Sequence, residues 1–185
     1  MGEPSSWSIG RLLRHYLDIA LLRRGPDDLP ASQTVLVFTV AGCIVISLLA
    51  SSMLPPTPAQ PLVLLALDTA VMLLWVWMAL RLAGKPERFL QTATGLFGVQ
   101  LVLSPLFAVG QWMFVNSSQG DQMPSPPVAV LLFMIGLWAL IVSARVLRAA
   151  TGWLTPICIA VMLSQALLVL GLQAMIYPEA ANAAL

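Results

Sequence analysis

The sequence predicts an all-α, polytopic membrane protein with five transmembrane helices and an N-terminal amphipathic helix at the membrane surface. Hydrophobic residues make up 59% of the 185 residues and charged residues only 9%, whereas soluble domains contain roughly 25% charged residues. The hydrophobic residues form five long runs, at about 33–53, 62–82, 89–115, 128–148 and 156–177. Each run can span a bilayer, because about 20 helical residues cross the hydrocarbon core.

The positions of the basic residues predict the orientation of these spans. All nine precede the first run, follow the second, or lie at the end of the fourth: Arg11, Arg14, Arg23, Arg24, Arg81, Lys85, Arg88, Arg145 and Arg148. Basic residues beside membrane spans stay on the cytoplasmic side. We therefore expect a cytoplasmic N-terminus and an external C-terminus. The excess of Arg over Lys, with abundant Ala and Leu, suggests a bacterial inner membrane.

Residues 1–31 are expected to form a cytoplasmic arm, and residues 32–185 a five-helix membrane domain. Residues 7–24 alternate between an apolar arc (Ile9, Leu12, Leu13, Tyr16, Leu17, Ala20) and a polar arc (Ser8, Arg11, Arg14, His15, Asp18). This spacing predicts an amphipathic helix in the inner headgroup layer, with its arginines, Arg11, Arg14, Arg23 and Arg24, directed toward anionic lipid. A secretory signal is the alternative, but arginines interrupt the apolar stretch.

Glycine and proline residues mark the boundaries of the predicted elements. Gly25-Pro26 ends the arm helix, and the segment 25–31 turns the chain into the first span. Gly84 caps the second span and Gly152 ends the fourth. Pro105 predicts a kink within the third span.

Asp68 is the ionisable residue that lies deepest in a predicted span, about 10 Å below the outer end of the second one. Helix rise places Gln100, Ser104 and Gln111 of the third span and Gln165 of the fifth at neighbouring depths. We therefore predict an intramembrane polar seam of Asp68, Gln100, Ser104, Gln111 and Gln165. One interpretation is a hydrogen-bonded packing cluster, and the other is a site for a proton or a cation.

The residue inventory argues against an enzyme. The sequence contains no phosphate-binding glycine loop, nucleophile elbow or HExxH helix. Its single histidine, His15, and its two cysteines, Cys43 and Cys158, are too scattered to predict a metal site. We expect no catalytic residue, cofactor or metal, and the net charge of +1 predicts no nucleic-acid partner.

The layout of a cytoplasmic helix followed by five closely looped spans resembles the Yip (Ypt-interacting) membrane family. The segments 25–30 (GPDDLP) and 88–92 (RFLQT) are similar to segments of small bacterial inner-membrane proteins. The Asp-Leu-Tyr-Gly-Pro and Gly-Tyr motifs of eukaryotic Yip members are absent. The resemblance implies a non-enzymatic scaffold that binds the bilayer and recruits a membrane-protein partner. The alternative is a small transporter or channel subunit with a polar path around Asp68.

Overall fold

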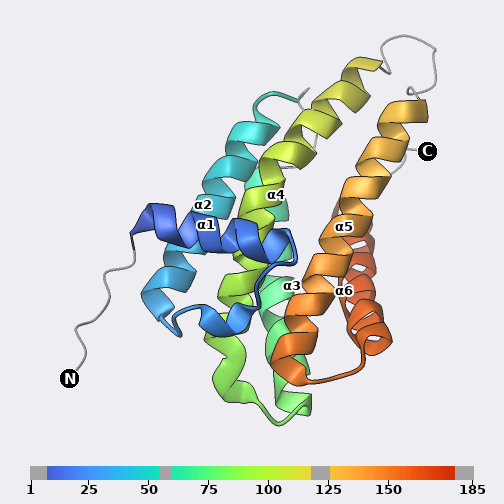
Figure 1. Cartoon of the computed structure of the whole chain (residues 1–185). Helices are drawn as coiled ribbons and strands as arrows, with labels where there is room; N and C mark the ends of the chain where they lie inside the picture. The colour runs from blue at the N-terminus through green and yellow to red at the C-terminus, as the bar shows by residue number, and fades with distance from the viewer. Residues whose placement is uncertain (1–7, 55–59, 118–125, 178–185) are drawn as a thin grey trace.

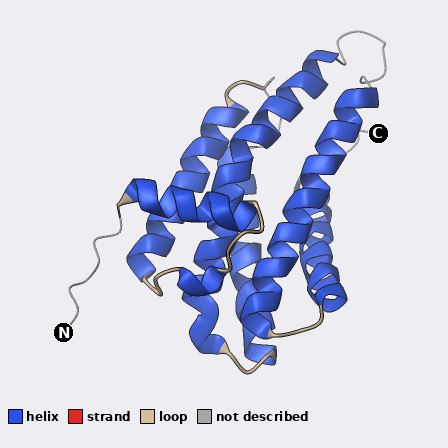
Figure 2. Cartoon of the chain, viewed as in Figure 1, coloured by secondary structure: helices blue, strands red, loops and turns tan. Residues whose placement is uncertain are grey.

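The structure, a computed structural model, describes residues 8–54, 60–117 and 126–177. Within these ranges it consists of helices and connecting loops and contains no strand (Figure 2). The helices are α1 (Ile9–Ala20), η1 (Pro26–Asp28), α2 (Gln33–Ser51), α3 (Pro61–Leu82), η2 (Pro86–Arg88), α4 (Phe89–Ser117), α5 (Pro126–Thr151) and α6 (Thr155–Ile176). Helices α2 to α6 are long and apolar enough to cross a membrane. The predicted fold class, an all-α protein with five spans, is confirmed.

The five long helices begin and end within three residues of the predicted spans, and the largest difference is at Thr151, where α5 ends. The residues expected to stop helices do so, because Gly84 and Gly152 adopt positive φ angles of 69° and 80° after α3 and α5. Helix α4 continues through Pro105.

Helix α4 is central to the fold, because it packs against α1, α2, α3 and α5 (Figure 1). Helix α6 completes the bundle by packing against α3 and α5. The buried part of α4 is its N-terminal half, where every residue from Thr92 to Val99 is buried. Within residues 104–117 only Gly110 is buried. The core of the protein therefore surrounds the first half of α4.

The basic segments from three parts of the chain meet at one end of the bundle. Lys85 Nζ donates a hydrogen bond to the carbonyl oxygen of Thr151 at 2.9 Å. Arg88 donates to the carbonyl oxygen of Ala149 at 3.2 Å and lies 3.4 Å from a carboxylate oxygen of Asp27. These contacts join the arm, the turn after α3 and the end of α5. We call this the basic end of the bundle.

Helix α1 is shorter than predicted, ending at Ala20 instead of residue 24. Residue 7, the predicted start, lies outside the described ranges. The early end has a local cause at Leu22, which adopts a left-handed φ of 60°. This turn lets the N–H groups of Arg23 and Arg24 donate to the carbonyl oxygen of Asp18 at 2.8 and 3.3 Å. The helix is thus closed before the chain reaches Gly25.

Helix α1 lies across α2 and α4 and also contacts α5 (Figure 1). Tyr16, Ile19 and Ala20 are buried against the bundle, whereas Leu13 and Leu17 on the same predicted apolar arc are 41% and 47% exposed. The polar arc is also divided, because His15 is only 5% exposed. The expectation of an exposed His15 was wrong, since α1 is packed into the protein along one flank.

Candidate functional site

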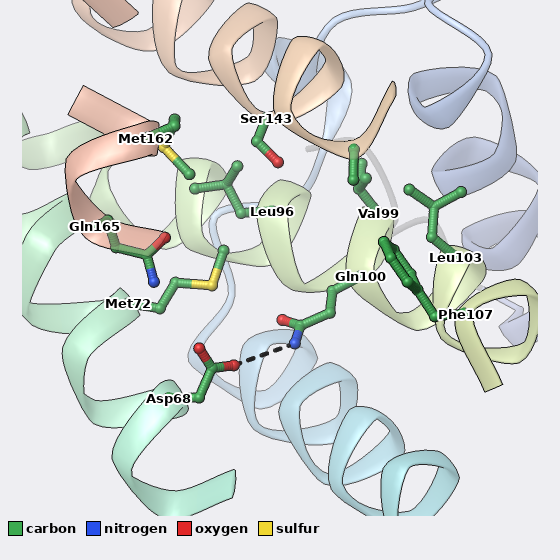
Figure 3. Close-up of a pocket in the computed structure, with 11 residues that line it drawn as sticks. Asp68, Met72, Leu96, Val99, Gln100, Leu103, Phe107, Ser143, Met162 and Gln165 are labelled. Carbon is green, nitrogen blue, oxygen red and sulfur yellow. Dashed lines mark hydrogen bonds between the residues drawn. The ribbon is translucent and has the colours of Figure 1, made fainter. Parts of the chain in front are cut away.

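The first candidate site is a pocket of about 170 Å³ between α3, α4, α5 and α6. Figure 3 shows Asp68, Gln100 and Gln165 directed into it from three different helices, with the thioethers of Met72 and Met162 beside them. Asp68 lies in the N-terminal half of α3, and the packing of α3 against α4 brings the carboxylate to Gln100. The pocket brings together polar side chains from four helices: Asp68, Gln100, Ser143 and Gln165.

Asp68 accepts a hydrogen bond from Gln100 Nε2 at 3.3 Å. The other amide atom, Gln100 Oε1, is buried and has no hydrogen-bond partner in the described structure. Gln165 is 8% exposed. The Asp68 carboxylate and the unsatisfied Gln100 oxygen can therefore both accept further hydrogen bonds.

The predicted polar seam is only partly assembled in the structure. Asp68, Gln100 and Gln165 line the pocket, but Ser104 and Gln111 do not. Ser104 Oγ instead donates to the carbonyl oxygen of Gln100 in its own helix at 2.6 Å. Gln111 is exposed, because it lies on the half of α4 that the bundle does not cover.

Sequence reasoning did not anticipate Ser143 or the two methionines among the pocket residues. A single Ser in an apolar span carries little signal, and Met occurs throughout the spans.

The volume and the lining residues of the pocket limit what it can bind. A volume of about 170 Å³ has room for a few water molecules or one small cation. Within the described ranges, no three His, Cys, Asp or Glu side chains are grouped closely enough to hold a metal ion.

The two cysteines are packing residues of the core. Both are buried and free. Cys43 Sγ lies 3.1 Å from the carbonyl oxygen of Phe97, and Cys158 Sγ lies 4.0 Å from Thr151 Oγ1. Cys43 thus donates a weak hydrogen bond to α4, and both cysteines act as small apolar residues between helices.

The second candidate site is a polar hollow of about 230 Å³ on the arm. It is lined by Arg11, Arg14, His15, Asp18, Arg24 and Asp28. Arg24 Nε lies 3.4 Å from a carboxylate oxygen of Asp18. The hollow contains three of the four predicted surface arginines together with two carboxylates, so its charges are mixed.

Tyr16 attaches the arm to the bundle, because it joins α1 to two of the long helices, α2 and α4. Its hydroxyl forms a 2.7 Å hydrogen bond with Thr39 Oγ1 of α2, and Thr39 in turn donates to the carbonyl oxygen of Val35. The ring lies on Gly98 of α4, where an added Cβ would be 2.6 Å from Tyr16 Cγ. Burial raises the pKa of the Tyr16 phenol, and the hydrogen bond to Thr39 lowers it by less.

The segment 25–31, predicted to be a simple turn, is a second attachment of the arm. Pro26 and Leu29 pack against Gly95, where an added Cβ would lie 3.3 Å from Pro26 Cβ. Gln91 Nε2 donates to the carbonyl oxygen of Leu29 at 3.0 Å, and Leu29 is 2% exposed. Hydrophobic periodicity could not predict this contact, because a proline-rich turn has no regular period.

Comparisons of this chain with protein families, with curated proteins and with solved structures found no match.

Proposed function

We propose that this protein is a non-enzymatic integral membrane scaffold whose arm recruits a membrane-protein partner. In this proposal the basic end faces the cytoplasm of a bacterial cell, the N-terminus is inside and the C-terminus is outside. The layout that resembles the Yip family supports the same role.

Arg88 and Lys85 contact the end of α5 at one end of the bundle. This supports the proposed orientation, because basic residues beside spans are retained in the cytoplasm. A reporter active only in the cytoplasm, fused after Leu185, tests it. The expected result is an inactive reporter there and an active one when the same reporter precedes Met1. Cytoplasmic activity after Leu185 would contradict the orientation.

The observation that carries the proposed function is the fixed position of α1. Because Tyr16, Ile19 and Ala20 are buried against the bundle, the exposed Arg11 and Arg14 are held in place at the protein surface. A surface on a docked helix loses less conformational entropy on binding than one on a mobile segment does. The arm therefore offers a preorganised surface for a partner.

The mixed charge of the hollow indicates the chemistry of that partner. Three arginines stand beside Asp18 and Asp28. A purely anionic ligand would be repelled by the two carboxylates, whereas a protein segment with both acidic and basic side chains can complement the hollow. We therefore expect the partner to contribute a cytoplasmic segment of mixed charge.

The test is charge reversal in the hollow, with a matched control at the same end of the protein. Arg11→Glu/Arg14→Glu is compared with Arg81→Glu, because Arg81 is exposed but lies over the Trp77 ring, away from the hollow. After crosslinking in cells, the wild type and Arg81→Glu are expected to purify with the same partner, and the double variant without it. If the wild type purifies without any crosslinked partner, the scaffold proposal fails.

The pocket around Asp68 favours a second candidate, a small transporter or channel subunit. Its carboxylate and the buried Gln100 Oε1 could accept hydrogen bonds from water or coordinate a small cation. Purified protein in liposomes distinguishes the two candidates. A proton or sodium flux that Asp68→Asn abolishes would support the transporter, and equal flux in the wild type, the variant and empty liposomes would exclude it.

A further inference from the structure

A third hollow, which shares Arg24 with the mixed-charge hollow, lies between the arm and α5 at the basic end. Its volume is about 250 Å³. Arg23, Arg24 and Arg145 line it, and its remaining wall includes Leu22, Val142 and Val146. The hollow therefore combines a cationic rim with an apolar wall.

The charge of this hollow has a single sign. No acidic side chain lines it. Of the acids nearest in the chain, Asp18 and Asp27 are paired with Arg24 and Arg88, and Asp28 lines the neighbouring mixed-charge hollow. Among the described residues, neither Arg23 nor Arg145 forms an ion pair, so two guanidinium groups remain available to an anion.

The local fold brings these arginines together from distant parts of the chain. The left-handed turn at Leu22 reverses the chain after α1 and directs Arg23 and Arg24 along α5. Trp138 of α5 donates a 3.1 Å hydrogen bond from Nε1 to the carbonyl oxygen of Ala20, which holds the end of α1 to α5. The position of the hollow is thus fixed by contacts on both elements.

An exposed apolar stripe continues from the hollow along α5. Arg145, Ile141, Trp138 and Met134 recur at intervals of four, three and four residues, so they share one helix face. Ile141, Trp138 and Met134 are 39%, 41% and 49% exposed. A ligand that contacts both features has an anionic head at Arg145 and an apolar tail beside Trp138.

We propose that this hollow binds one anionic glycerophospholipid, with its phosphate between Arg23, Arg24 and Arg145 and an acyl chain along the α5 stripe. Basic pockets beside membrane helices on the cytoplasmic side bind anionic lipid headgroups, and arginine forms paired hydrogen bonds with phosphate oxygens. The apolar wall and stripe favour a lipid over free phosphate. The inference uses the proposed orientation of the basic end but needs no protein partner.

The experiment is a lipid titration of the purified full chain in detergent, followed by native mass spectrometry, with no partner present. The probes are dioleoylphosphatidylglycerol, dioleoylphosphatidylcholine and inorganic phosphate. Tight binding of one phosphatidylglycerol is expected. Arg145→Gln should weaken it about fivefold and Arg23→Gln/Arg145→Gln about 30-fold, because each arginine contributes a similar attraction to an anionic headgroup. Arg81→Gln, which removes one charge outside the hollow, should leave the affinity unchanged.

Three outcomes would overturn the proposal. Equal affinity for phosphatidylcholine would show that the charge is not recognised, and equal weakening by Arg81→Gln would show that the attraction is not local. Displacement of the lipid by millimolar inorganic phosphate would identify a site for free phosphate. Size-exclusion profiles check that the variants remain folded, which is expected because Arg23 and Arg145 are exposed. Loss of lipid binding would leave the crosslinking of a partner to the arm unaffected, so the two proposals fail separately.

Discussion

The aromatic ring of Tyr16 lies directly on Gly98, and no other amino acid fits at residue 98 without moving the ring. This contact joins the arm to the centre of the most buried helix, since Phe97 and Val99 on either side are 1% and 2% exposed. The absence of a side chain at Gly98 is therefore what allows α1 to lie against the bundle.

Gly98→Ala is expected to displace α1, because the added Cβ would lie 2.6 Å from Tyr16 Cγ. Overpacking of this kind costs about 1–3 kcal/mol. The measurement is the thermal unfolding midpoint in detergent together with the rate of protease cleavage in residues 9–24. Gly136→Ala is the control, since no atom lies within 4 Å of its added Cβ. Identical behaviour of the two variants would contradict the packing.

Tyr16→Phe removes the hydrogen bond to Thr39 and is expected to destabilise the arm by about 1 kcal/mol at neutral pH. The variant also tests the raised pKa of the phenol. The folded state holds this proton more tightly than the unfolded state, so its contribution to stability is complete below the unfolded pKa of about 10. It is lost as the pH rises through the folded value. The wild type should lose stability above pH 10 more steeply than Tyr16→Phe, and parallel curves would argue against a buried phenol.

The segment 25–31 is held by two polar contacts that differ in burial. Substitutions that remove them should therefore differ in their cost to stability. Gln91→Leu leaves the carbonyl oxygen of the buried Leu29 without its donor and should cost about 1–3 kcal/mol. Asp27→Asn weakens an ion pair whose side chains are 40% and 63% exposed, and should cost less than about 1 kcal/mol. Thermal unfolding of the two variants beside the wild type measures the order. A larger loss of stability for Asp27→Asn than for Gln91→Leu would mean that the segment 25–31 does not hold the arm through Leu29.

Asp68→Asn and Asp68→Leu separate a hydrogen-bonding role from packing. The asparagine can still accept the bond from Gln100, so its stability should match the wild type within about 1 kcal/mol. Leucine cannot accept it, and the stranded amide should cost about 1–3 kcal/mol. Unfolding in detergent of both variants provides the comparison. A leucine variant as stable as the asparagine variant would show that the bond to Gln100 contributes little.

The span boundaries could be predicted because apolar runs, glycines and prolines are local signals. The depth of Asp68 relative to Gln100 and Gln165 was also predictable, since helix rise fixes depth. The direction in which a side chain points was not, and Gln111 illustrates this. It shares a helix face with Gln100, yet the bundle covers only the first half of α4. Hydropathy cannot show this difference, because lipid and protein core are equally apolar.

The arm illustrates the same limit of sequence reasoning. The 3.6-residue period predicted a helix here but could not show that the flank with Tyr16 and His15 would be buried, which divides both predicted arcs. The hollow with Arg145 depends on the turn at Leu22, a non-glycine residue with a left-handed φ. No sequence rule predicts this conformation for a leucine.

The contact of Tyr16 with Gly98 also sets the order of events during synthesis. The arm leaves the ribosome before any of the five long helices. Its contact with α4 forms later, after α2 and α3 have been translated. Until then Tyr16 can reach Thr39 of α2 but has no Gly98 to pack on. The arm therefore completes its attachment only once the third long helix has been inserted.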